Sequence, residues 1–72
     1  MPKLYSSSRI IKVLLFKDFV FISQKGSHAK YRKFSHPPLT VIVPSGKKEI
    51  PVGTFKSILR QANLSEEDFK KK

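Results

Sequence analysis

The sequence has no cysteine, which excludes two ways of stabilising a small protein. Neither a disulfide nor a thiolate zinc site can hold the chain together. Stability must therefore come from an apolar core or from a partner protein. Seventy-two residues allow one domain at most, which we place at residues 1–72. The 39% hydrophobic content, with six Phe and two Tyr, predicts a globular rather than a disordered chain.

Acidic residues are also scarce. Five Asp and Glu stand against fifteen Lys and Arg, which gives a formal net charge of +10. Three of the five acids (Glu66, Glu67 and Asp68) lie near the C-terminus, so the remaining chain is more basic still. Solubility requires far less excess charge than this. The charge therefore predicts a polyanionic partner: nucleic acid, an anionic membrane or an acidic protein.

Long hydrophobic runs are absent. The longest, at residues 13–16 and 19–22, are interrupted by Lys17 and Asp18 and are too short to span a bilayer. The first eight residues lack the apolar core and cleavage site of a signal peptide. We therefore expect a soluble cytoplasmic protein that does not bind membranes.

Hydrophobic spacing predicts the order helix, strand, strand, strand, helix, with a final short helix. The expected segments are a helix capped at residues 6–8 and ending at Asp18, strands at 19–24, 27–34 and 39–43, a helix from Pro51 to Ala62 and a last turn opening at Ser65. Turns are expected at Lys25-Gly26 and at residues 35–38. This order predicts an α+β two-layer sandwich, with a three-stranded antiparallel sheet and helices on one face. The order matches that of double-stranded RNA-binding domains.

One segment combines residues that could carry chemistry. His28 follows a tight turn, and Lys30 and Arg32 share its face of the predicted strand, at intervals of about 7 Å. Ala29 and Tyr31 lie on the opposite face. Histidine can remove a proton from a ribose 2′-hydroxyl or return one to a leaving 5′-oxygen, and neighbouring cations can stabilise a phosphoryl group. These are the groups that a metal-free ribonuclease requires.

The residues alone leave other interpretations open. A surface histidine in a basic strand can equally be a binding residue or a neutral one. His36, beside two prolines, is interpreted as a turn residue, with a second proton carrier as the alternative. Tyr31 is expected in the core, although Tyr31 or Phe34 could instead stack on bases.

Several runs of residues resemble the HicA family of mRNA interferase toxins. They are Ser8-Arg9, Asp18-Phe19-Val20-Phe21, Gln24-Lys25-Gly26-Ser27-His28, Lys48-Glu49-Ile50 and the run from Gly53 to Ala62. The resemblance covers about residues 7 to 69. It implies a fold similar to the double-stranded RNA-binding domain and cleavage of messenger RNA. It also implies a HicB-type antitoxin that covers the active face, with a monomeric free toxin that forms a hetero-oligomer with the antitoxin.

The resemblance assigns the catalytic role to His28, in the Gly-Ser-His element. Gly26 and Ser27 are expected to shape the turn that presents the imidazole. Phosphate and RNA contacts are expected from basic residues of the same region: Lys25, Lys30, Arg32, Lys33, Lys47 and Lys48. No metal or cofactor is expected, because the acids are mostly C-terminal and the two histidines are separated.

The chain departs from the family pattern at two positions. Many members have a second histidine in the loop after the third strand, where this chain has Ser45. If that histidine assists catalysis, the activity here is reduced or shared differently. Asp18 replaces the usual glycine before the first strand's phenylalanine, which we expect to affect a helix cap rather than chemistry.

Three functions remain as hypotheses. The first is an endoribonuclease toxin that inhibits translation and acts through His28. The second is a non-catalytic RNA-binding module that uses the same basic face. The third is a protein-binding domain whose basic surface docks an acidic partner.

Overall fold

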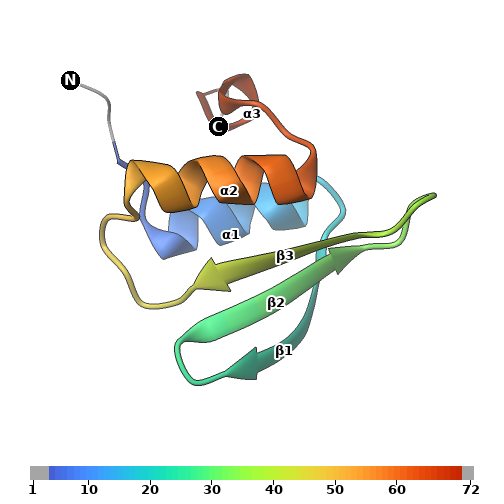
Figure 1. Ribbon diagram of the computed structural model, residues 1–72, viewed down its shortest axis with the longest axis horizontal. Helices are drawn as coiled ribbons and strands as arrows, with labels where there is room; N and C mark the ends of the chain where they lie inside the picture. Colours follow the sequence, from blue (N-terminus) through green and yellow to red (C-terminus); the bar gives the residue numbers. More distant parts are fainter. Residues whose placement is uncertain (1–3, 71–72) are drawn as a thin grey trace.

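Three antiparallel strands form one sheet in the order β1-β2-β3, and the helices pack on one of its faces (Figure 1). The computed structural model describes residues 4–70. In chain order, the elements are α1 (Ser7–Phe16), β1 (Val20–Lys25), β2 (His28–Lys33), β3 (Leu39–Pro44), α2 (Val52–Ala62) and α3 (Glu66–Lys70). The predicted α+β order is confirmed. Within residues 4–70, no helix has the length and apolar character needed to cross a membrane.

Helix α1 begins where the serine run predicted. The Ser6 hydroxyl accepts a hydrogen bond from the Arg9 backbone N–H at 3.2 Å, which is the geometry of an N-cap. Ile10, Val13 and Leu14 face the core and are fully buried, whereas Leu15, which the helical spacing also placed on the apolar face, is 51% exposed.

The connection between α1 and β1 corrects the sequence prediction for Phe19. This residue precedes β1 rather than opening it, and its N–H donates to the Leu14 carbonyl at 2.9 Å. The turn is made by Asp18, whose φ is +74°, a left-handed conformation that glycine adopts with less strain. The reversal directs the Phe19 ring into the core, where it is only 2% exposed.

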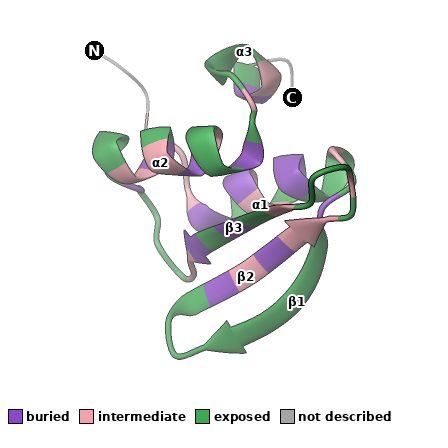
Figure 2. Cartoon of the chain, turned by 45° about the vertical axis from the view of Figure 1, so that its right-hand side comes forward, coloured by how far each residue is buried: buried purple, intermediate pink, exposed green. Residues whose placement is uncertain are grey.

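The sheet is covered unevenly by the helices. In Figure 2, buried and partly buried residues alternate along β2, whereas every residue of β1 is exposed. The helices contact β3 most closely, so β1 lies at the uncovered edge. Ala29, Tyr31, Val41 and Val43 face the helices and are buried. The prediction that Tyr31 belongs to the core is therefore confirmed.

The last helix closes the core from the far side. The Asp68 carboxylate accepts a hydrogen bond from the Ser65 N–H at 2.9 Å, which supports the predicted capping box. The Phe69 ring is completely buried, 5.0 Å from the Phe55 ring and 5.7 Å from that of Tyr5. These contacts fix α3 against α2 and the segment before α1.

Other element boundaries differ slightly from the predictions. Pro51 is the N-cap of α2 rather than a residue of its first turn, and Asn63 ends that helix with φ +58° as predicted for a C-terminal cap. Ile50 lies in the loop before α2 yet is fully buried, with its N–H bonded to the Tyr5 carbonyl at 2.8 Å.

Candidate functional site

The turn between β1 and β2 presents His28 at the end of the sheet. The turn residues are Gly26 and Ser27, one position later than the sequence predicted, and Lys25 and His28 flank them as a cross-strand pair. Gly26 has φ +60°, the positive value required at the first position of a tight two-residue hairpin turn. His28 is exposed and opens β2. The imidazole is thus accessible on a short, geometrically defined hairpin.

The loop after β3 supports this turn from the side. The Ser45 N–H donates to the Ser27 carbonyl at 2.7 Å. The Gln24 side-chain amide donates to both the Gly26 carbonyl, at 3.1 Å, and the Ser45 hydroxyl, at 3.2 Å. Ser45 therefore lies beside the His28 turn and is held there by hydrogen bonds.

Ser7 anchors the same loop to α1. Its hydroxyl donates to the Pro44 carbonyl at 2.6 Å and accepts from the Lys47 N–H at 3.0 Å. Its own N–H donates to the Lys47 carbonyl at 2.9 Å. Ser7 is buried, with 3% of its surface exposed. Sequence reasoning treated the serine run only as a helix cap and missed this role, because the partners are about forty residues away in the chain.

His28, Lys30 and Arg32 share the open face of the sheet. Their β3 partners are Pro44, Ile42 and Thr40 in turn, and the intervening Ala29 and Tyr31 point into the core. The Arg32 Nε donates to the Thr40 hydroxyl at 3.2 Å, which holds the guanidinium across this face. Burial raises the pKa of Tyr31, whose side chain is only 6% exposed.

The remaining predicted basic residues divide between several places. Lys25 pairs with His28 across the hairpin, which brings its side chain to the same face and next to the imidazole. Lys47 and Lys48 are exposed in the loop that Ser7 anchors. Side chains alternate between the two faces of β2, and Lys33 falls on the same face as the buried Tyr31. It therefore points to the helix side, away from Lys30 and Arg32.

His36 does not belong to this site. It lies in the connection between β2 and β3, at the other end of β2 from His28. A six-residue strand separates the two histidines by about 20 Å. The two histidines are therefore too far apart to act on one group, and His36 lies in a bend between the strands, which agrees with its interpretation as a turn residue.

The sheet is free of negative charge. No Asp or Glu occurs between Asp18 and Glu49, a segment that contains all three strands. The same segment carries six cations: Lys25, Lys30, Arg32, Lys33, Lys47 and Lys48. The open face therefore presents a positive potential without internal compensation, which attracts a polyanion. Within residues 4–70, no group of three or more His, Cys, Asp or Glu side chains is arranged to hold a metal ion.

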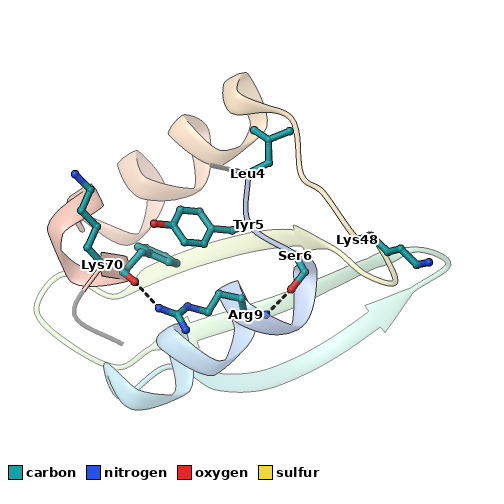
Figure 3. A pocket seen from close by; sticks show the side chains of 7 residues that line it. Leu4, Tyr5, Ser6, Arg9, Lys48 and Lys70 are labelled. Carbon is teal, nitrogen blue, oxygen red and sulfur yellow. Dashed lines mark hydrogen bonds between the residues drawn. The ribbon is translucent and has the colours of Figure 1, made fainter. Parts of the chain in front are cut away.

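A separate hollow of about 630 Å³ lies between α1, α3 and the loop before α2 (Figure 3). Arg9 lies at its base and donates to the Phe69 carbonyl at 2.7 Å. In Figure 3, the ammonium groups of Lys48 and Lys70 point away from this guanidinium. Arg9 thus fixes α3 to α1, and the three cations do not converge on one ligand.

Comparisons with known proteins place these features in a family. Residues 7–64 match the HicA toxin of bacterial toxin–antitoxin systems, a range that includes α1, the whole sheet and α2. No curated protein matches the chain. Since the match spans most of the sequence, the chain belongs to the HicA toxin family.

Proposed function

We propose that this HicA-family toxin is a metal-independent endoribonuclease that cleaves messenger RNA through His28 and thereby inhibits translation. The observation that carries the proposal is the placement of His28. An exposed imidazole stands at the end of an open sheet face, in line with Lys30 and Arg32 and paired with Lys25. The same face carries no carboxylate that would repel a phosphate.

The proposed reaction is an internal transesterification. The neutral imidazole of His28 accepts the proton of a ribose 2′-hydroxyl, and the 2′-oxygen attacks the adjacent phosphorus. The bond between phosphorus and the 5′-oxygen breaks, and the 5′-oxygen takes a proton from water. The products are a 2′,3′-cyclic phosphate and a 5′-hydroxyl. Lys25 and Lys30, which flank the imidazole on the same face, stabilise the charge that develops on the phosphoryl oxygens.

Further basic residues extend the RNA path. Arg32 continues the row along β2, and Lys47 and Lys48 extend it over the loop after β3. Gly26 and Ser27 form the turn that carries the imidazole. Lys33, on the helix side of the strand, contributes through its long-range charge rather than by contact with the bound strand.

The proposed partner of the free toxin is a HicB-type antitoxin. Membership of a toxin–antitoxin family supports an antitoxin partner, and the uncompensated positive face favours one with an acidic surface. Binding of such a partner over His28 would exclude RNA from the face described above.

The direct test is cleavage of a long, labelled single-stranded RNA in EDTA. We expect the wild type to cleave and the His28→Ala variant to lose at least about 100-fold in rate, the smallest usual contribution of a general base. His36→Ala, which removes the other histidine about 20 Å away, is the matched control and retains cleavage. Circular dichroism establishes that both variants are folded. Strict magnesium dependence, or full activity of His28→Ala, contradicts the mechanism.

One observation favours a second function. Ser45 occupies the position where the resembling family has a second histidine, and it is hydrogen-bonded to Gln24 beside the His28 turn. A hydroxyl there cannot replace an imidazole as a proton carrier near neutral pH. If neither wild type nor His28→Ala cleaves RNA but both bind it equally, the chain is an RNA-binding module. Restoration of cleavage by Ser45→His would then identify the missing group.

A further inference from the structure

Phe34 has an unusual position for an apolar side chain in so small a fold. It directly follows β2 and has 72% of its surface exposed, the highest value among the exposed large hydrophobic residues of the described chain. The connection between β2 and β3 that carries it projects beyond the helical layer (Figure 1). Among the helices of residues 4–70, none is therefore positioned to cover this ring.

The projecting connection has a defined shape. The Ser35 N–H donates to the Lys33 carbonyl at 3.0 Å, and the Ser35 hydroxyl donates to the Pro37 carbonyl at 2.8 Å. Pro37 and Pro38 each restrict φ to one value. A ring held on such a segment loses little conformational entropy when it binds a ligand.

Phe34 extends the row of residues that begins at His28. Continuing the strand alternation by one residue beyond β2 places Phe34 on the side of Lys30 and Arg32. Two residues of a strand span about 6.6 Å, and six span about 20 Å. This step is close to the spacing of phosphates in an extended single strand, so the row from His28 to Phe34 corresponds to about three nucleotides.

The surroundings of Phe34 indicate the chemistry of its ligand. Arg32 lies two residues away on the same side of the strand, Lys33 precedes the ring on the helix side, and the nearest acids in the sequence are Asp18 and Glu49. A protein-binding hot spot requires surrounding apolar contacts that exclude water, and the chain neighbours of this ring are Lys33 and Ser35. An exposed aromatic ring among cations is instead the arrangement by which proteins bind single-stranded nucleic acid, with bases stacked on rings and phosphates on cations.

We propose that Phe34 is a base-stacking residue that binds an unpaired base about three nucleotides from the phosphate at His28. This inference rests on the proposed RNA-cleaving function and adds to it a contact that sets the register of the strand. Because every base has a π-face, the contact selects unpaired RNA rather than a particular sequence.

The test uses single-stranded oligonucleotides that carry 2′-O-methyl groups, which prevent cleavage, and one 2-aminopurine that is moved along the strand. Binding is measured with the full-length wild type, Phe34→Ala, Phe34→Trp, His28→Ala and Phe16→Ala. Phe16 is the matched control, because it is an exposed phenylalanine (63%) on α1, in the helical layer. Cleavage of unmodified RNA by each protein is measured in parallel.

If the proposal is right, the wild type quenches 2-aminopurine at one position. Phe34→Ala then loses this quenching and about 5- to 150-fold in affinity, the usual range for removal of one stacked base. Phe34→Trp restores both, whereas Phe16→Ala quenches like the wild type. In the cleavage assay, Phe34→Ala raises KM more than it lowers kcat.

Three results would overturn the proposal. The first is unchanged affinity and quenching for Phe34→Ala while His28-dependent cleavage persists, which leaves the nuclease function intact. The second is loss of antitoxin binding alone by Phe34→Ala, which would assign the ring to a protein interface. The third is no affinity of the wild type for RNA, which removes the proposed function as well. Quenching that depends on Phe34, without cleavage by any protein, supports the stacking role and contradicts only the catalytic one.

Discussion

Removal of the Ser7 hydroxyl tests whether α1 holds the loop beside His28. The Ser7→Ala variant loses the 2.6 Å bond to the Pro44 carbonyl and the 3.0 Å bond from the Lys47 N–H. The bond from the Ser7 N–H to the Lys47 carbonyl remains, because it belongs to the backbone. The substitution therefore removes the two side-chain hydrogen bonds between α1 and the loop after β3 and keeps the backbone one.

The expected cost follows from the burial of the two partners. Lys47 is exposed, so water can replace the Ser7 hydroxyl as the partner of the Lys47 N–H. Pro44 is partly buried and lies next to the buried Ser7, so its carbonyl is less accessible to water. A lost hydrogen bond costs about 1 kcal/mol, and a buried group left without a partner costs about 1–3 kcal/mol. We expect the free energy of unfolding to fall by about 2 kcal/mol. For a domain of this size, that lowers Tm by about 8–16 °C.

Thermal unfolding followed by circular dichroism measures this effect, with Ser8→Ala as the matched control. Ser8 is the next residue of α1, is exposed, and has only a 3.2 Å contact with the Ser6 hydroxyl. Both substitutions replace serine by alanine in the first helical turn, so any gain in helix propensity is shared. If the two variants melt within about 2 °C of each other, the hydroxyl of Ser7 does not fix the loop.

Two further predictions concern α3. Phe69→Ala removes a fully buried ring that packs against Phe55, so we expect the free energy of unfolding measured in urea to fall by about 3–5 kcal/mol; a loss below about 1 kcal/mol would mean that α3 is not part of the core. The hydrogen bond from the Ser65 N–H and the ammonium of Lys17, 3.0 Å away, lower the pKa of Asp68. The contribution of the Asp68 carboxylate to the stability of the fold is therefore complete above the unfolded-state pKa of Asp68. It is lost as the pH falls through the lower folded-state pKa. Asp68→Asn should flatten that part of the pH–stability curve, and an unchanged curve would contradict the assignment.

The strand periodicity predicted most of the candidate site. Alternation between apolar and basic residues from His28 to Arg32 placed Ala29 and Tyr31 in the core, and the structure confirms both positions. The hairpin was predicted one residue early, because Gly26 suits either position of a short turn. That single step matters: it makes Lys25 the cross-strand partner of His28 rather than a turn residue.

Contacts between distant segments were not predictable in the same way. The bonds of Ser7 to Pro44 and Lys47 leave no periodic signal, since serine is common at helix starts for the local reason of capping. The same holds for Phe69, which follows three acidic residues in a five-residue helix and gives no amphipathic pattern. A family match ending at residue 64 does not include this ring either.

The sequence alone determined the order of the elements, the charge of the open face and the residues that alternate along β2. These depend on local conformational preference, on hydrophobic spacing and on simple composition, which are properties of neighbouring residues. Only the tertiary structure decided which groups lie next to His28, how Ser45 is held there and that Phe34 remains uncovered. Those outcomes depend on the register of the strands and on the position of α1 and α2 over the sheet. Packing of the whole core sets both, and no single segment does.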